Sequence, residues 1–309
     1  MRDPDPPEFG LAILGSTCLS RHLAAIEALP RLKLVAHCSG GEREASELPR
    51  LASTHGTYDE VLTDADVRGV TVCTSPVERL HWIRRSAAAG KHVFSESPVV
   101  STYRQGRDLA AYCRRMGTSL AVAGPPIYSD LARVVEDCQR NGKIGRPLHF
   151  ELSRHIPKES LATEKEGVLL LQGVFAMDLL RARFGQLDSV YARTRSIGLN
   201  RSAEDIAVAQ LRFLNGVEGT VQINGLGSRS GISFHLYGSD GAAELGEDQQ
   251  RAAGDGLRVQ YESFMAAADG RGEPEFGGRE LVQGLFMVEW LNQSARKDRE
   301  VYRGEVELG

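Results

Sequence analysis

The sequence lacks the features of several large classes of protein. No apolar run approaches the roughly 20 residues that a helix needs to cross a bilayer, so we expect no membrane-spanning segment. The net charge of −4 leaves no excess of positive charge to attract nucleic acid or an anionic membrane. The start of the chain is acidic and proline-rich, whereas a secretory signal is basic and then apolar. We therefore expect a cytoplasmic protein that acts on a small molecule and binds neither nucleic acid nor membrane.

Cysteine is scarce, and no two cysteines form a CxxC pair. Isolated cysteines suit a reducing compartment and argue against a disulfide framework or a structural zinc site. We therefore expect free thiols and no bound metal. The five cysteines are Cys18, Cys38, Cys73, Cys113 and Cys138.

The composition that remains is that of a globular protein with two domains. The chain has 309 residues, of which 41% are hydrophobic and 25% charged. A chain of this length exceeds what a single small core organises and suits two domains.

The first 124 residues alternate short apolar runs with helical stretches, and this alternation predicts an α/β fold. Continuous apolar runs fit strands buried on both faces, and strand–helix alternation predicts parallel βαβ units in a doubly wound, Rossmann-type sheet. We expect strands over 9–14, 32–38, 69–74, 92–95 and 119–124, and helices over 20–29, 82–89 and 103–116.

The pattern changes at Gly124, which we take as the domain boundary. Residues 125–309 contain longer, alternating strands, and these predict a second α/β domain with an open, mostly antiparallel sheet. Asn215-Gly216 is a hairpin turn signal between two of the strands. We expect strands over 148–154, 190–196, 207–213, 218–224, 232–237 and 242–245, and helices over 129–141, 167–183 and 279–294.

The turn after the first strand is a candidate dinucleotide site. A helix N-terminus offers free N–H groups to a pyrophosphate, and the usual GxGxxG fingerprint lets the backbone approach it closely. Here only Gly15 remains, and Ser16 and Thr17 follow it with hydroxyl groups that could donate to phosphate. The alternative is a βα turn that binds no cofactor.

The end of the second strand bears on which cofactor would bind. An acid at this position contacts the ribose hydroxyls of NAD, but this chain has Ser39, and Arg43 follows shortly after. Loss of the carboxylate and gain of a guanidinium favour a 2′-phosphate, and therefore NADP(H) over NAD(H). The alternative is that Arg43 only solvates a loop.

Further motifs carry a family resemblance over nearly the whole chain. They are Tyr58-Asp59-Glu60-Val61-Leu62, Thr74-Ser75-Pro76, Gly90-Lys91-His92-Val93 with Glu96 and Pro98, the stretch 142–147, Asp178-Leu179-Leu180 and the stretch 237–241. Together they make the chain resemble the glucose–fructose oxidoreductase/inositol dehydrogenase family, Gfo/Idh/MocA. The resemblance implies a Rossmann domain with Thr74, Ser75, Pro76 and Glu96 on the cofactor side. It also implies a homo-oligomer formed through the C-terminal sheet.

The chain departs from that family where the chemistry takes place. The resemblance implies a catalytic lysine before Pro98, but Ser97 stands there. The family motif DxGxHxxD becomes Leu171, Gly173, Phe175 and Asp178, so Leu171 replaces the aspartate and Phe175 the histidine. A leucine and a phenylalanine cannot move a proton. We therefore expect that the family's alcohol–ketone reaction on a polyol or sugar is lost, and that Leu171 and Phe175 line an apolar pocket or join the core.

Three side chains remain as candidates for proton transfer. Tyr128 lies where the chain enters the second domain and is either a proton donor or a packed boundary aromatic. His155 follows the first long strand and is either a proton-transfer group or a solvated loop residue. Ser97 can donate a hydrogen bond, or it is a plain turn residue.

Two functions fit these observations. The first is an NAD(P)H-dependent reductase with an atypical proton donor, acting on a small, rather apolar imine or an activated C=C or C=O bond. Thiazolinyl imine reductases are similar in having a weakened glycine fingerprint and no lysine before the proline. The second is a redox-inactive relative that binds no dinucleotide and serves as a partner subunit, a ligand-binding protein or a non-redox enzyme.

Overall fold

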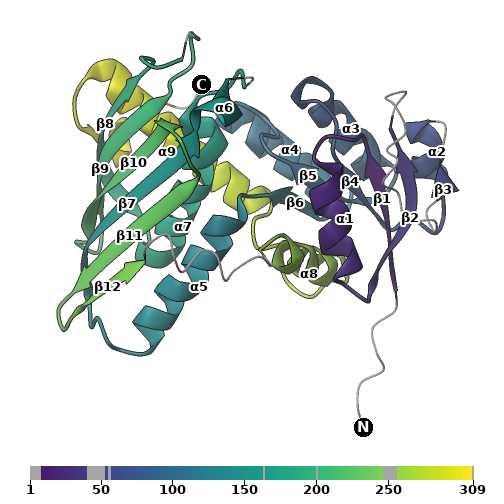
Figure 1. Cartoon of the computed structure of the whole chain (residues 1–309), viewed down its shortest axis with the longest axis horizontal. Helices are drawn as coiled ribbons and strands as arrows, with labels where there is room; N and C mark the ends of the chain where they lie inside the picture. Colours follow the sequence, from purple (N-terminus) through teal and green to yellow (C-terminus); the bar gives the residue numbers. More distant parts are fainter. Residues whose placement is uncertain are drawn as a thin grey trace. The chain divides into compact units, whose positions relative to one another are not determined.

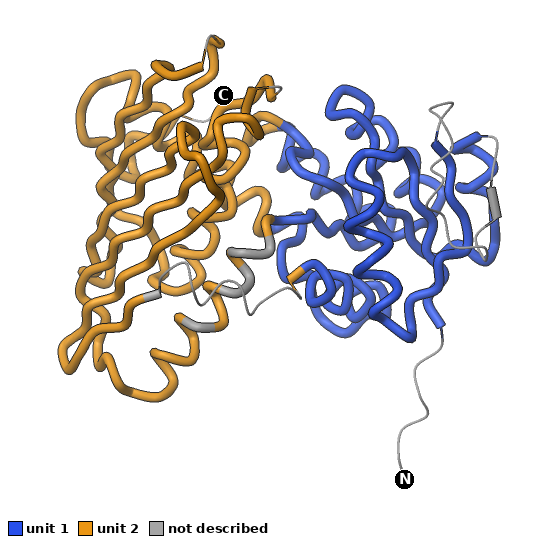
Figure 2. The backbone as a smooth tube through the Cα atoms, in the orientation of Figure 1, with its two compact units in different colours: residues 1–100, 105–124, 257–279 blue, residues 101–104, 125–256, 280–309 orange. Residues whose placement is uncertain are grey.

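The structure of the chain is a computed structural model that describes residues 8–39, 53–54, 57–162, 164–199, 201–245 and 256–307 (Figure 1). The chain divides into two compact units, each with its own sheet (Figure 2). None of the helices in these ranges is long and apolar enough to span a bilayer. The first unit comprises residues 1–100, 105–124 and 257–279, and the second comprises 101–104, 125–256 and 280–309.

The first unit contains a six-stranded parallel sheet of Rossmann type, as predicted, with the order β3-β2-β1-β4-β5-β6. Strands β1, β4 and β6 are buried at every position, because their runs of apolar residues face helices on both sides. The strands are β1 (Phe9–Leu14), β2 (Leu32–Cys38), β3 (Ser53–Thr54), β4 (Gly69–Val72), β5 (His92–Glu96) and β6 (Leu120–Ala123). The helices that connect them are α1 (Leu19–Glu27), α2 (Tyr58–Thr63), α3 (Pro76–Ala88) and α4 (Tyr103–Arg115).

Helix α8 (Gly256–Ala268) also belongs to the first unit, and the sequence analysis missed it. Its apolar residues Leu257, Tyr261 and Phe264 join the same buried cluster as β1 and α1. Gln260 donates to the carbonyl of Gly124 and accepts from its amide, at 3.2 and 3.1 Å. The first unit therefore includes residues 257–279, which lie beyond the single boundary that we expected at residue 124.

The second unit contains a seven-stranded, mostly antiparallel sheet with the order β12-β11-β7-β10-β9-β8-β13. The exception is β7 and β10, which pair in parallel because the chain builds helices and two strands before it returns alongside β7. Asn215-Gly216 forms the predicted turn between β9 and β10, with Gly216 at φ 85°. The strands are β7 (Pro147–Pro157), β8 (Leu187–Arg195), β9 (Ile206–Phe213), β10 (Glu218–Gly227), β11 (Gly231–Gly238), β12 (Ala242–Leu245) and β13 (Val301–Tyr302).

One face of this second sheet is covered by helices, and the other is open. In β7 the side chains of Phe150 and Leu152 are buried, whereas His149 and Glu151 alternate with them on the open face. Phe150 stacks on Phe184 of α7 at 5.1 Å, which anchors the helical layer to the sheet. The helical segments are α5 (Pro126–Arg140), α6 (Lys158–Leu161), a π-helix (Leu169–Gly173), α7 (Val174–Phe184), α9 (Gly278–Lys297) and a 3₁₀ turn (Arg303–Glu305).

Candidate functional site

The carboxyl edge of the first sheet gathers the predicted cofactor residues. All strands of this sheet are parallel, so the segments that follow them emerge at the same edge. In doubly wound sheets, ligands bind at this edge at the point where the strand order reverses. Here that point lies between β1 and β4. The predicted residues at this edge are Gly15, Ser16, Thr17, Ser39, Thr74, Ser75, Pro76, Glu96 and Ser97.

Gly15 is required by the turn that leaves β1. Its φ is 90°, and a Cβ atom built on it would lie 2.4 Å from the carbonyl oxygen of Cys73. The Gly15 amide donates to the carbonyl of Cys38 at 2.8 Å, and the Thr17 amide donates to that of Cys73 at 3.0 Å. These bonds hold the turn against the ends of both neighbouring strands, while the Thr17 amide is no longer available to a phosphate.

The N-terminus of α1 offers hydrogen-bonding groups to a ligand. The helix follows Cys18, which has a φ of 60° and whose side chain makes no capping hydrogen bond. The hydroxyl oxygen of Ser16 is buried and has no hydrogen-bond partner among the residues that the structure describes. A pyrophosphate at this position would accept hydrogen bonds from the first turn of the helix and from Ser16. The residues present therefore fit a dinucleotide, although the glycine fingerprint is incomplete.

The end of β2 carries the residues that bear on cofactor choice. Ser39 follows the strand and is half-buried, whereas Arg43 lies outside the described residues, so the preference for NADP(H) stays a prediction. Just before Ser39, the buried His37 lies with Nε2 3.2 Å from the carbonyl oxygen of Gly15, to which it donates in its Nε2–H form. Burial lowers the pKa of His37, so a neutral imidazole makes this hydrogen bond to the turn at Gly15.

Arg79 ties together two loops at this edge. Its guanidinium is 2% exposed and donates to the carbonyl of Thr74 at 2.9 Å and to that of Pro98 at 2.8 Å. It therefore fixes the Thr74-Ser75-Pro76 loop against the segment that contains Ser97, which is half-buried. The sequence analysis missed Arg79. The available signal was a basic residue near the start of a helix, where the helix dipole disfavours positive charge.

Two basic residues of α1, Arg21 and His22, hydrogen-bond to Glu96. Its Oε1 accepts hydrogen bonds from Arg21 at 2.7 Å and from His22 Nε2 at 2.5 Å. The other ring nitrogen of His22 lies 2.8 Å from the hydroxyl of Tyr261, which lies 2.9 Å from that of Thr71. Sequence reasoning missed this buried network. Its only signal was a histidine among the apolar residues of a helix.

The network determines the charge of Glu96. Burial acts to raise the pKa of Glu96, but the His22 hydrogen bond and the charges of His22, Arg21 and Arg79 outweigh it and hold that pKa below its usual value. Glu96 is therefore a fixed carboxylate at neutral pH, which leaves it without a proton to donate.

A second group of candidate residues lies within the second unit, on the helical side of its sheet. Tyr128 of α5 is 5% exposed, and its ring stacks on Phe175 of α7 at 6.1 Å. Its hydroxyl has no hydrogen-bond partner within the described ranges. Burial raises the pKa of Tyr128 to about 12, although the nearby guanidinium of Arg154 acts to lower it. The phenol therefore stays protonated at neutral pH.

Arg154 lies beside Tyr128 and was missed by the sequence analysis. It is 5% exposed and occupies an inward position of β7, where Phe150 and Leu152 are apolar. Its Nε donates to Gln172 Oε1 at 2.9 Å. Its Nη1 donates to the carbonyl of His155 in β7, to the hydroxyl of Ser230 and to the carbonyl of Gly231 at the start of β11. The signal was a charged residue in the apolar phase of an alternating strand.

The other predicted residues of this unit lie in different surroundings. Leu171 is half-buried in the π-helix, a type of segment that occurs frequently at functional sites, and Phe175 is buried next to Tyr128. His155 belongs to β7 itself, not to a loop after it, and alternates with Arg154 onto the open face, where it contacts Ser153 at 3.3 Å. The structure therefore brings together Tyr128 and Phe175 and leaves His155 on the opposite face.

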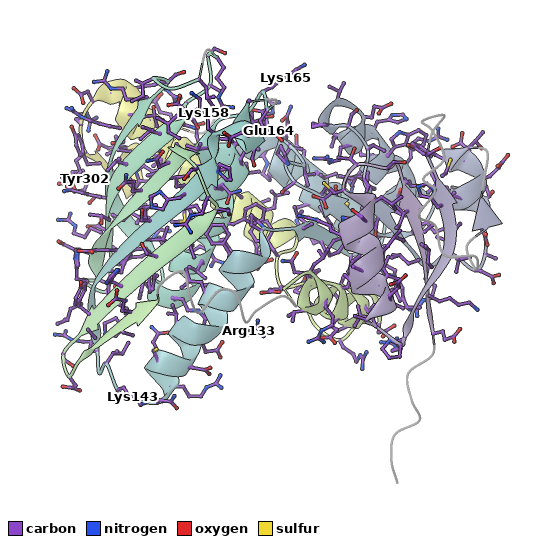
Figure 3. All side chains as sticks on the ribbon, viewed as in Figure 1. Arg133, Lys143, Lys158, Glu164, Lys165 and Tyr302 are labelled. Atoms are coloured by element: carbon purple, nitrogen blue, oxygen red, sulfur yellow. The ribbon has the colours of Figure 1, made fainter. Side chains whose placement is uncertain are left out.

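Two further observations concern charged residues. Lys158, the first residue of α6, and Lys165, which follows that helix, extend from the surface of the second unit (Figure 3). Within the described ranges no three His, Cys, Asp or Glu side chains are arranged to hold a metal ion.

Comparison with known proteins identifies both halves of the chain. Residues 9–123 match the model of an oxidoreductase family with an NAD-binding Rossmann fold, and residues 133–244 match the model of the GFO/IDH/MocA C-terminal domain. The chain is 26% identical to YhhX, an uncharacterized oxidoreductase of Escherichia coli (strain K12), over 80% of this chain and 69% of that protein. It is 22% identical to D-apiose dehydrogenase of Paraburkholderia graminis, over 95% of this chain and 89% of that enzyme.

Solved structures have the same fold. The WlbA dehydrogenase of Bordetella pertussis, in complex with NADH and UDP-GlcNAcA, superposes with a TM-score of 0.83 at 22% identity, covering 96% of this chain and 98% of WlbA. A probable dehydrogenase of Thermotoga maritima superposes with a TM-score of 0.85 at 17% identity, covering 97% of this chain and all of that one. Given the two family matches and the Rossmann edge described above, this chain belongs to the Gfo/Idh/MocA family of oxidoreductases, with an NAD-binding Rossmann fold.

Proposed function

We propose that the protein is an NAD(P)H-dependent reductase that acts on a small substrate with a C=N, activated C=C or C=O bond, and that Tyr128 is its proton donor. The observation that carries the proposal is the turn at Gly15, which keeps the backbone of a dinucleotide site although two glycines of the fingerprint are absent. Such a turn with a buried, unpartnered Ser16 hydroxyl serves a ligand better than it serves the fold.

The cofactor in this proposal is NADP(H). The pyrophosphate would lie at the N-terminus of α1 and Ser16, and the adenosine ribose near the end of β2. Ser39 provides no carboxylate to repel a 2′-phosphate, and Arg43 supplies a positive charge in the sequence just beyond it. When bound, the reduced nicotinamide supplies the hydride.

The proton donor follows from which groups retain a transferable proton. Glu96 is held as a carboxylate, and Leu171 and Phe175 have no proton to give. Tyr128 keeps its proton at neutral pH and has no acceptor of its own. Its O–H can donate to an imine nitrogen or a carbonyl oxygen as the neighbouring carbon is reduced, and water then restores the proton. The stacked ring of Phe175 favours a substrate with an apolar part.

A redox-inactive relative is the second candidate, and one observation favours it. Thr17 stands at the second glycine position of the fingerprint, where the backbone would approach a pyrophosphate, and its amide donates to the Cys73 carbonyl instead. If this closes the site, the scaffold would bind no dinucleotide.

Titration of the purified protein with NADPH and NADH, followed by nicotinamide fluorescence, separates the two functions. We expect saturable binding with NADPH preferred. Gly15→Val should abolish binding, since its side chain would collide with the Cys73 carbonyl. Gly117→Ala is the matched control, because Gly117 also has a positive φ of 70° but open space around it. No binding at millimolar NADPH would refute the reductase.

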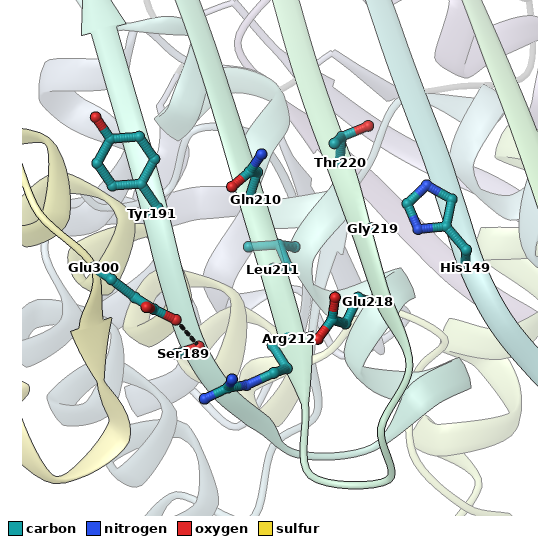
Figure 4. A pocket seen from close by; sticks show the side chains of 10 residues that line it. All are labelled: His149, Ser189, Tyr191, Gln210, Leu211, Arg212, Glu218, Gly219, Thr220 and Glu300. Atoms are coloured by element: carbon teal, nitrogen blue, oxygen red, sulfur yellow. Dashed lines mark hydrogen bonds between the residues drawn. The ribbon is translucent and has the colours of Figure 1, made fainter.

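We also propose that two copies of the chain associate through the open face of the second sheet. That face has a hollow of about 540 Å³ lined by groups of both charges, including His149, Arg212, Glu218 and Glu300 (Figure 4). A surface that carries both charges can pair with its own copy across a two-fold axis.

A further inference from the structure

Arg154 is a buried cation without an anionic partner. Its side chain is 5% exposed, and its hydrogen bonds go to neutral groups only: the Gln172 and Ser230 side chains and the carbonyls of His155 and Gly231. In the described part of the chain no carboxylate forms an ion pair with it. A buried charge without a counter-ion is strongly unfavourable, so an anion bound beside Arg154 would stabilise the site.

The contacts of Arg154 leave two groups incomplete. Its Nε and Nη1 make the hydrogen bonds described above, which join β7 to the π-helix and to β11. The guanidinium also interacts with the buried hydroxyl of Tyr128. Within the described ranges that hydroxyl makes no hydrogen bond of regular geometry, so its O–H has no acceptor. A structural role explains the bonds of Nε and Nη1, but it explains neither the missing counter-ion of Arg154 nor the Tyr128 O–H without an acceptor.

We propose that the Arg154 guanidinium binds a carboxylate of the substrate, and that the reducible C=O or C=N bond is directly attached to this carboxylate. Arg154 and Tyr128 are adjacent, so the groups that they bind must be adjacent in the ligand as well. Guanidinium N–H groups suit carboxylate oxygens, and Tyr128 then faces the neighbouring oxygen or nitrogen. This inference rests on the proposed function and names its substrate class: small 2-oxo or 2-imino acids with an apolar side chain, which would lie against Phe175.

The experiment measures binding, so it needs no turnover. The methyl ester of benzoylformate replaces the negative carboxylate by a neutral group with one additional methyl. Each compound is titrated calorimetrically into the full-length protein with and without NADPH. We expect the acid to bind about ten- to a hundredfold more tightly than the ester, the range of a hydrogen bond to a charged group. Phenyl phosphate, an anion without the adjacent carbonyl, should bind more weakly than benzoylformate.

Two variants assign the two halves of the site. Arg154→Gln should remove the preference for the acid, whereas Arg195→Gln, which removes an exposed arginine from β8 of the same sheet, should leave it unchanged. Tyr128→Phe should weaken the acid and the ester by the same factor of about three to ten, because both ligands present the ketone.

Several outcomes would overturn the inference. They are equal affinity of acid and ester for the wild-type protein, a preference that survives in folded Arg154→Gln, tighter binding of phenyl phosphate, or no effect of Tyr128→Phe on either ligand. The wild-type comparison and Tyr128→Phe decide the matter even if Arg154→Gln does not fold. If NADPH does not bind, the reductase proposal is refuted, but the acid–ester comparison still tests whether Arg154 binds a carboxylate.

Discussion

Two buried tyrosines of this chain differ in what their hydroxyl groups contact. The hydroxyl of Tyr261 lies within hydrogen-bond distance of His22 and Thr71, whereas that of Tyr128 makes no hydrogen bond of regular geometry in the described part of the chain. Tyr128→Phe should therefore leave the free energy of unfolding unchanged or raise it by about 1 kcal/mol, while Tyr261→Phe should lower it by about 1–3 kcal/mol. Urea unfolding of both variants measures this. A large loss of stability in Tyr128→Phe would mean that its hydroxyl serves the fold.

The same substitution tests the catalytic role of Tyr128. Loss of a general acid reduces turnover by about a hundredfold or more. We expect Tyr128→Phe to retain NADPH binding and stability but to lose reduction of a 2-oxo acid, measured by NADPH absorbance. Turnover at the wild-type rate would remove Tyr128 as the donor.

Two histidines, the buried His37 and the half-buried His92, make the first unit sensitive to acid. Burial lowers the pKa of His37 and of His92, and Nδ1 of His92 accepts a hydrogen bond from the Ser119 amide that a protonated ring cannot accept. Unfolded histidine has a pKa of about 6.5. Stability is therefore fully present above about pH 6.5 and is lost as the pH falls from there through the lowered folded pKa values. Urea unfolding at several pH values measures the loss. His92→Asn should reduce it and the exposed His81→Asn should not; an equal loss in all three proteins would contradict this account.

At the scale of elements, Gln260 of α8 hydrogen-bonds to the residue that follows β6. Gln260 is 5% exposed and makes two hydrogen bonds with the backbone of Gly124. Gln260→Ala leaves a buried amide and carbonyl unsatisfied and should lower the free energy of unfolding by about 2–4 kcal/mol. Glu262→Ala, at an exposed ion pair of the same helix, should change it by less than about 1 kcal/mol. Denaturant unfolding compares them, and equal effects would show that the contact with Gly124 is unimportant.

The elements also differ in how well their patterns predict them. The strand over residues 32–38 has the predicted bounds, and the Asn215-Gly216 hairpin forms as predicted, because both depend on local chemistry. The helix expected over 167–183 instead begins as a π-helix, since hydrophobic spacing does not distinguish the two helix types over one turn. Helix α8 was missed although Leu257, Tyr261, Phe264 and Met265 have helical spacing.

At the scale of the whole molecule, the proposed association of two copies concerns the open face of the second sheet. Val208 is 45% exposed and Tyr237 39% exposed at outward positions of β9 and β11. We expect a homo-oligomer by size-exclusion chromatography with light scattering. Val208→Lys should weaken it by placing like charges at the interface, whereas Val77→Lys, at an 84% exposed site of the first unit, should not. A wild-type monomer at micromolar concentration would refute the proposed association.

The sequence alone determined the presence of the two sheets and the family, because these depend on local hydrophobic period and on motifs that lie close together in the chain. The loss of the usual proton-transfer groups at Ser97, Leu171 and Phe175 stays a prediction that rests on residue identity. Only the tertiary structure decided which side chains meet. His22 hydrogen-bonds to Glu96, 74 residues away in the chain. Arg154 hydrogen-bonds to Gln172 and Ser230 from an inward position of β7, where the sequence pattern predicts an apolar core residue. Such contacts depend on packing between distant segments and on which buried polar group is left without a partner, and neither leaves a local pattern in the sequence.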